Sequence, residues 1–266
     1  MTLPDADSPD ADSPDADSRA LAAYALALGD DALVLAQRCG EWITNAPQLE
    51  EDVALANIGL DLLGQARTLL TYAGEVEGQG RGEDDLAYLR DERDFTNVQL
   101  VELVNGDFAG TMARQLAFST YQLALYDELR RSTDPTLAAI AAKAVKEVAY
   151  HRDHATSWVL RLGDGTDESS RRMQSGLERV WPYVGELFDA SWIAPALIEQ
   201  GVAVDVRALE PSWRAYLEKV LSEATLEVPG VAQRPTGGRR GVHTEAMGYL
   251  LAEMQHLARS HPGARW

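Results

Sequence analysis

The sequence predicts an all-α protein built on a four-helix bundle with additional C-terminal helices. Apolar residues recur with a 3.6-residue period through four long segments, and short stretches rich in glycine, proline, asparagine or aspartate separate these segments. No segment shows the convincing alternation of apolar and polar residues that is typical of a strand. Hydrophobic residues make up 45% of the 266 residues, which is enough for a sizeable core.

The four bundle helices are predicted at residues 20–43, 49–73, 108–130 and 137–162. Asp134 followed by Pro135 is a typical start for the fourth helix, because aspartate caps a helix N-terminus and proline is tolerated in its first turn. A helix of 25 residues is about 37 Å long. Bundles of that length carry cofactors between their facing helices.

The C-terminal part of the chain predicts three further helices. They are expected at residues 169–188, 212–224 and 244–259. Pro182 falls inside the first of them, where its ring and missing N–H should kink or split the helix.

The N-terminus is an acidic repeat, with three copies of PDADS between Pro4 and Ser18. This segment has nothing apolar to bury, so we expect residues 1–18 to be disordered and residues 19–266 to form a single helical domain. It lacks the basic start and apolar stretch of a signal peptide. The rest of the chain still has 36 acidic and 24 basic residues.

Composition excludes several classes of function. A formal net charge of −18 leaves no basic face for nucleic acid. The sequence contains no run of 18 apolar residues, so no membrane span is predicted. A single cysteine, Cys39, excludes both an intramolecular disulfide and a multi-cysteine metal site. These features predict a cytoplasmic protein.

The inward faces of the four helices have few residues that could bind metal. A carboxylate-bridged di-iron bundle takes one Glu or Asp from each of two helices and Glu-x-x-His from each of two others. Anionic oxygens are needed because two iron ions bring several positive charges into a low-dielectric interior. The six equivalent positions in this sequence are Ala32, Leu62, Gln65, Ser119, Val148 and His151. One ligand of six remains, so we expect no di-iron centre in this chain.

His151 therefore has a plainer interpretation, as a hydrogen-bonded core histidine. We expect Gln65 and Ser119 to be its partners or to bind water, because buried polar groups need partners. Glu147 and Asp61 are expected beside the inward stripes and not on them. His154 lies one turn from His151 in HRDH, but no third ligand is near in sequence, so a zinc site is only weakly indicated.

Several longer motifs carry a resemblance to a known family. Residues 29–67, with LDLLGQAR at their end, together with KAVKEVAYHRDHA, GTDESSRRMQ, ELFDA, TGGRRGVHTE and LAEMQHL, resemble the C-subunit family of the phenylacetyl-CoA epoxidases. The resemblance covers about residues 20–266. It implies a ferritin-like fold and a core of two kinds of subunit, in which the irons belong to a sister A subunit.

The resemblance also implies how the metal ligands were lost. The sister subunit has Asp-Glu-Ala-Gly-His where this chain has Asp-Leu-Leu-Gly-Gln, so a Glu and a His correspond to Leu62 and Gln65. It has Lys-Glu-Glu-x-x-His where this chain has Val148 in place of the second Glu. This pattern resembles a metal site that was filled with uncharged side chains, a change that can stabilise a fold.

The function implied by the resemblance is that of a non-catalytic subunit. It would scaffold the catalytic A subunit of an oxygenase that epoxidises the ring of phenylacetyl-CoA, with electrons supplied by a separate reductase. No cofactor is expected in this chain. The alternative is a ferritin-like metalloenzyme with its own site around His151 and His154; the metal content of the isolated chain distinguishes the two.

Two segments are candidates for contact with coenzyme A or with a partner. Asp94, Phe95, Thr96 and Asn97 precede a helix, and an exposed helix start with an aromatic residue could meet an adenine or a phosphate, although a plain turn capped by Thr96 or Asn97 is the simpler interpretation. Arg239 and Arg240 lie in a glycine-rich basic loop of an acidic chain. We expect this loop to dock on an acidic partner and not on coenzyme A phosphates.

Overall fold

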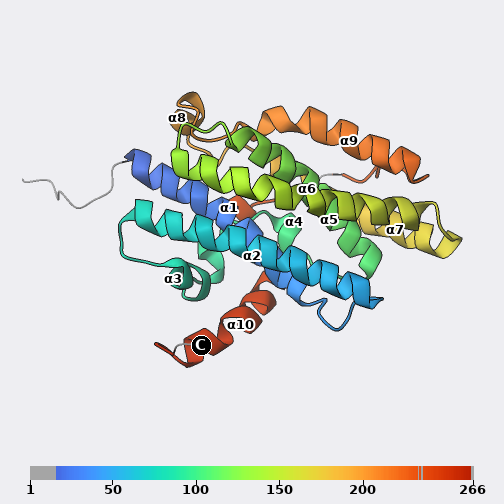
Figure 1. Ribbon diagram of the computed structural model, residues 1–266, viewed down its shortest axis with the longest axis horizontal. Helices are drawn as coiled ribbons and strands as arrows, with labels where there is room; N and C mark the ends of the chain where they lie inside the picture. Colours follow the sequence, from blue (N-terminus) through green and yellow to red (C-terminus); the bar gives the residue numbers. More distant parts are fainter. Residues whose placement is uncertain (1–15, 233, 235, 265–266) are drawn as a thin grey trace, which may run out of the picture.

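The computed structural model describes residues 16–232, 234 and 236–264, and these residues confirm the predicted all-α, ferritin-like fold. Four long helices form the body: α1 (Ala16–Gly40), α2 (Leu49–Glu77), α5 (Phe108–Leu129) and α6 (Pro135–Gly163). Helices α2 and α6 lie on the face turned to the viewer in Figure 1, with α1 and α5 behind them. The described residues contain no strand beyond one isolated bridge between Gly237 and Val242.

The two layers of the bundle differ in how completely they are covered. Every residue of α1 from position 27 to position 35 is buried, and so is every residue of α5 from position 109 to position 122. In α2 and α6, buried residues alternate with exposed ones at helical spacing. The inner layer is therefore enclosed, and the outer layer has a free face.

Burial also accounts for the apolar character of α1. By length and composition α1 could cross a membrane, but 67% of the qualifying stretch is buried inside the fold. The helix begins at Ala16, four residues before its predicted start, so Ala16 to Ser18 of the acidic repeat belong to it. The rest of the repeat, and with it most of the predicted disorder, lies outside the described residues.

Local signals set several of the observed helix ends. Asp134 caps α6 by accepting a hydrogen bond from the Leu137 N–H at 2.8 Å, and Pro135 is the first helical residue, as predicted. Helix α2 runs four residues further than predicted and is capped by Gly78, whose φ of 70° is the left-handed conformation that glycine adopts without strain.

The predicted break at Pro182 is confirmed. Helix α7 (Asp167–Val180) ends directly before a 3₁₀ segment, η2 (Trp181–Phe188), in which Pro182 occupies the first turn. Proline lacks an N–H and its ring clashes with the preceding turn, so it cannot continue the α-helical ladder but does fit a new helix start.

Short helices complete the chain and cover the inner layer. The segment between α2 and α5, in which only a helix after Asn97 was predicted, forms α3 (Glu83–Tyr88), η1 (Glu92–Asp94) and α4 (Gln99–Glu102). The C-terminal part adds α8 (Pro195–Glu199), η3 (Val206–Leu209), α9 (Glu210–Glu223), η4 (Gly238–Arg240) and α10 (Glu245–Ser260). Helix α9 lies along the bundle, whereas α10 extends away from it towards the C-terminus (Figure 1).

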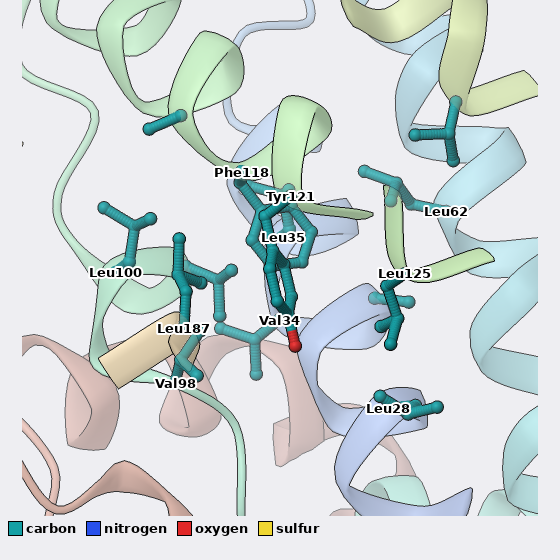
Figure 2. Close-up of a cluster of buried hydrophobic side chains, with 14 of the residues drawn as sticks. Leu28, Val34, Leu35, Leu62, Val98, Leu100, Phe118, Tyr121, Leu125 and Leu187 are labelled. Carbon is teal, nitrogen blue, oxygen red and sulfur yellow. The ribbon is translucent and has the colours of Figure 1, made fainter. Parts of the chain in front are cut away.

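Apolar side chains fill the interior of the bundle. Figure 2 shows Leu62 of α2 and Leu125 of α5 on one side of Phe118 and Tyr121 within this cluster of buried side chains. Leu62 is 1% exposed. Elsewhere on α5, the Trp213 indole of α9 donates a hydrogen bond to the Ala117 carbonyl at 2.8 Å. Helix α9 is thereby anchored on α5.

Candidate functional site

All six positions equivalent to di-iron ligands are buried in the bundle. They lie on the four long helices, Ala32 on α1, Leu62 and Gln65 on α2, Ser119 on α5, and Val148 and His151 on α6. We call them the ligand-equivalent positions. Three are apolar, two are neutral polar residues and one is a histidine. Such a set supplies no anionic oxygen, so it does not fit a di-iron centre.

His151 pairs with a residue that was not expected to reach it. Its Nε2 lies 3.0 Å from Oδ2 of Asp61 on α2. The expectation was that Gln65 and Ser119 bind His151 or water. The first alternative is wrong in the described hydrogen bonds, where the Ser119 hydroxyl donates to the carbonyl of Gln115, one turn back on its own helix, and the second stays a prediction. Burial lowers the pKa of His151, and the hydrogen bond to Asp61 offsets only part of that effect.

Gln65 is held by two other side chains. Its amide N–H donates to Oε2 of Glu147 at 3.0 Å, and its amide oxygen accepts from the Gln122 amide at 3.2 Å. Both ends of the Gln65 amide are therefore satisfied without a metal ion. Gln122, which is buried on α5, was missed because it lies off the predicted inward stripe.

His154 does not join His151 in a shared metal site. Its Nε2 lies 2.7 Å from Oε2 of Glu51, so each histidine has its own carboxylate from α2. Among the described residues, no group of three or more His, Cys, Asp or Glu side chains is placed to hold a metal ion. The expectation that the chain binds no iron stays a prediction for metal analysis.

Buried charges occur elsewhere, in a region the sequence analysis did not find. Asp30 and Asp31, in the middle of α1, are both buried. Arg90 pairs with Asp30, with Nη1 3.0 Å from Oδ2, and Arg239 pairs with Asp31, with Nη2 2.7 Å from Oδ2. Burial raises the pKa of Asp31 to about 6, although the charge of Arg239 opposes this shift.

A buried histidine and glutamate extend these pairs. His243 Nδ1 lies 2.7 Å from Oε2 of Glu102, and its Nε2 lies 2.9 Å from the carbonyl oxygen of Phe95. Both partners are acceptors, so both ring nitrogens must donate and the ring is an imidazolium. Burial alone would lower the pKa of His243, but Glu102 and the Phe95 carbonyl outweigh burial and raise it.

Glu186 completes the cluster from η2. Its carboxylate accepts from the backbone N–H of Gln99 at 2.8 Å and from that of Arg239 at 3.4 Å. Burial raises the pKa of Glu186, and these hydrogen bonds partly offset the effect. We call the whole cluster the ion network; its members are Asp30, Asp31, Arg90, Glu102, Glu186, Arg239 and His243.

The ion network overturns the proposed exposure of the basic loop. Arg239 is only 7% exposed, and its Nη1 donates to the carbonyls of Ala27 at 3.0 Å and Thr96 at 2.9 Å. It cannot dock on an external partner or on coenzyme A while it holds these contacts. Arg240 differs, since its side chain is exposed and lies 3.9 Å from Asp189.

The segment of Asp94 to Asn97 is likewise turned inward for the most part. Phe95 is fully buried beneath Arg90, whose guanidinium lies 4.0 Å from the ring centroid, so Phe95 is not free to meet an adenine.

Asn97 is also buried and donates to Glu102 Oε2 at 3.0 Å. The N-cap of α4 is Val98, without a side-chain cap, so neither Thr96 nor Asn97 caps that helix. Thr96 instead donates to Asp30, and Asp94 remains exposed.

The two segments marked separately in the sequence thus meet in one buried cluster. The signal that could have located it is the Asp30–Asp31 pair inside an otherwise apolar helix, because buried carboxylates require cations. The cations come from residues 60 and 208 positions away, which the sequence alone does not pair.

Comparison with known proteins gives a matching family and a close relative. The model of the family described as phenylacetic acid catabolic protein matches residues 5–266. The chain is 53% identical over 246 residues to the C subunit of the 1,2-phenylacetyl-CoA epoxidase of Escherichia coli (strain K12). That alignment covers 92% of this chain and 99% of the relative.

Proposed function

The chain belongs to the phenylacetic acid catabolic protein family, and from this we propose that it is a non-catalytic subunit of a phenylacetyl-CoA epoxidase. The resemblance read from the sequence motifs is confirmed at this level. In the proposed role, the chain scaffolds a catalytic A subunit of a cytoplasmic, multicomponent oxygenase that epoxidises the ring of phenylacetyl-CoA. A reductase supplies the electrons.

One observation carries the non-catalytic part of this proposal. The ligand-equivalent positions offer a single histidine, and that histidine faces Asp61 on α2. Ring epoxidation with dioxygen needs a redox centre, and Ala32, Leu62 and Val148 supply no donor for one. These observations support our proposal that the di-iron centre belongs to the partner A subunit.

The chain's own contribution is a rigid, well-filled bundle. The ion network fixes the C-terminal loop onto α1, and α2 is tied to α6 by the pairs His151–Asp61, His154–Glu51 and Gln65–Glu147. A rigid scaffold holds a partner's active site in one geometry. Of the residues considered for direct contact with coenzyme A, Arg240 and Asp94 remain accessible.

Reconstitution tests the proposal. Phenylacetyl-CoA turnover is measured with the reductase and with the A subunit alone, this chain alone, or both. We expect turnover with both, none with this chain alone, and strongly reduced turnover with the A subunit alone. Epoxidation by this chain without the A subunit would overturn the proposal and favour the metalloenzyme with a site around His151 and His154.

A further inference from the structure

Arginine side chains gather in one hollow of the surface, beside the start of α5. The hollow has a volume of about 380 Å³, and its lining residues are Asp107, Arg171, Arg172, Ser175, Gly176 and Arg179. We call it the arginine pocket. Three of its six residues carry a positive charge, although the whole chain has a formal net charge of −18. The pocket is therefore a local exception to the acidic surface.

The pocket is built on one face of α7. Arg172, Ser175, Gly176 and Arg179 recur at intervals of three and four residues, so they lie on the same side of the helix. This side approaches the first turn of α5 closely, because a Cβ atom at Gly176 would lie 2.8 Å from the Cα of Gly110. The close approach brings the arginines of α7 to the N-terminal end of α5.

Two of the arginines share their carboxylates. Arg171 and Arg172 both pair with Glu168, at 2.8 Å and 2.7 Å. Asp107 lies 3.9 Å from Arg172, and its other carboxylate oxygen caps α5. These two carboxylates face two arginines, so neither is left to neutralise the third.

Arg179 lies where a positive charge is unfavourable. It forms no ion pair among the described residues, and its Nη2 donates to the carbonyl of Asn105 at 2.9 Å. A Cβ atom at Gly110 would collide with that Nη2, so the guanidinium rests directly on the first turn of α5. A helix N-terminus has a partial positive charge of its own, roughly half an elementary charge. An anion bound in the pocket would be attracted by both.

A buried arginine adds to the positive potential at this end of α5. Arg114 is 1% exposed, forms no ion pair within the described part of the chain, and donates to the Asn105 side-chain oxygen at 2.6 Å. Burial lowers the pKa of Arg114 to about 10, and the charges of Arg38 and Arg179 act in the same direction. Asn105 thus joins two arginines that have no carboxylate partner.

We propose that the arginine pocket binds the phosphate group of a small organic phosphomonoester. Guanidinium groups suit this ligand because their N–H donors meet two phosphate oxygens at once. A phosphomonoester carries about −1.5 to −2 charges at pH 7, more than a carboxylate, which matches the excess of positive charge. The hydroxyl of Ser175, which is exposed in the same pocket, supplies a further donor.

The size of the pocket favours an ester over inorganic phosphate. Small-molecule sites have volumes of roughly 300–1,000 Å³. The 380 Å³ of the arginine pocket falls within that range and leaves room for part of the organic group beside the phosphate. The proposal concerns residues of this chain alone and is independent of the role proposed above. It gives a function to the arginines of the GTDESSRRMQ motif, which that role does not use.

The experiment measures the binding of ribose 5-phosphate, ribose and inorganic phosphate to the full chain by calorimetry at constant ionic strength. We expect ribose 5-phosphate to bind at a single site and more tightly than inorganic phosphate, and ribose not to bind. Arg172→Gln with Arg179→Gln should weaken the binding of ribose 5-phosphate at least about 10-fold. Arg207→Gln with Arg214→Gln removes the same charge from exposed arginines outside the pocket and should bind like the wild type.

Ser175→Glu gives an independent variant if the loss of Arg179 disturbs the fold, which thermal melting checks. It places a carboxylate in the pocket without changing an arginine, and should also weaken binding at least about 10-fold. Ser222→Glu, the same change at an exposed serine of α9, should not.

Three results would overturn the proposal. The first is no binding of ribose 5-phosphate to the wild-type chain. The second is an equal loss of affinity in the pocket variants and their controls, which would show that the attraction is not specific to the pocket. The third is equal affinity for inorganic phosphate and ribose 5-phosphate, which would replace the phosphomonoester site by a plain oxyanion site.

Discussion

Asp31 and Ala32 are neighbours on α1, and both are buried. They belong to two different regions, since the region around Asp31 buries charged side chains and the region around Ala32 buries mostly uncharged ones. Asp31 keeps its carboxylate in the ion network, where Arg239 neutralises it at 2.7 Å. Ala32 presents only a methyl group at a ligand-equivalent position. The fold is therefore able to bury carboxylates where cations are built in. Their absence at the ligand-equivalent positions is a property of those positions and not of the helix.

The difference shows two ways in which a fold can neutralise buried carboxylates, with salt bridges or with bound metal ions. The ion network neutralises its carboxylates with arginine and histidine side chains from distant segments. A di-iron site neutralises its carboxylates with the metal ions. Without the metal, uncharged side chains avoid the desolvation cost altogether.

Breaking the ion network should give the largest effect. Arg239→Ala leaves Asp31 buried without its cation and leaves two backbone carbonyls without their donor, so we expect a loss of roughly 3–5 kcal/mol in the free energy of unfolding. Denaturant titration measures it. Arg240→Ala, which removes an exposed arginine from the same loop, should change stability by less than about 0.5 kcal/mol. Equal effects of the two variants would contradict the burial of Arg239.

Placing a carboxylate in the other region sharpens the comparison. Val148→Glu introduces a charge at a ligand-equivalent position that has no cation, so we expect a cost on the order of 3 kcal/mol or more. Val148→Gln has nearly the same shape without the charge and should cost less. The difference in the free energy of unfolding between the Glu and Gln variants should become smaller at acidic pH, where the new carboxyl takes up a proton. A Glu variant as stable as the Gln variant at neutral pH would show that this region does accommodate charge.

His151→Ala should give a smaller loss. It empties a buried position and removes the partner of the Asp61 carboxylate, which is itself partly exposed to water. We expect about 1–3 kcal/mol in the free energy of unfolding. Turnover of the assembled complex should persist provided the complex forms. Abolished turnover in a complex of normal stability would indicate a catalytic role for His151.

The two buried histidines should respond to pH with opposite signs. The pKa of His243 is raised, so its contribution to stability is complete below the unfolded pKa and is lost as pH rises through the folded value. The pKa of His151 is lowered, so its contribution is present above the unfolded pKa and is lost as pH falls through the folded value.

Unfolding midpoints between about pH 5 and 8 test these signs. Relative to the wild type, His243→Gln should cost more at the acidic end of this range, and His151→Gln should cost more at the alkaline end. The same pH trend for both variants would contradict the assignment of an imidazolium to one region and a neutral ring to the other.

The features that could be predicted from the sequence are local ones. The Asp134 cap, the break at Pro182 and the apolar periods of the long helices depend on residues a few positions apart. The ligand-equivalent positions were also found, because inward-facing residues recur at fixed helical spacing. The short helices α3 and η1 between α2 and α5 were missed, since their few residues show no measurable period.

The ion network was missed for two physical reasons. Its pairs join residues far apart in sequence, and each helix was assumed to bury only one stripe. Helix α1 is buried on all sides between positions 27 and 35, so Asp30 and Asp31 could not face water as such a stripe implies. Arg239 was predicted to lie on the surface for a different reason, namely that an arginine in a glycine-rich loop is usually exposed.

Iron analysis of the purified chain tests the central claim most directly. The chain is expressed alone, supplied with ferrous iron and oxygen, and freed of loosely bound metal before measurement. We expect far less than one iron atom per chain and no absorption from an oxo-bridged pair, because the ligand-equivalent positions keep one histidine and supply no carboxylate. Stoichiometric iron retained by the chain alone would contradict the account.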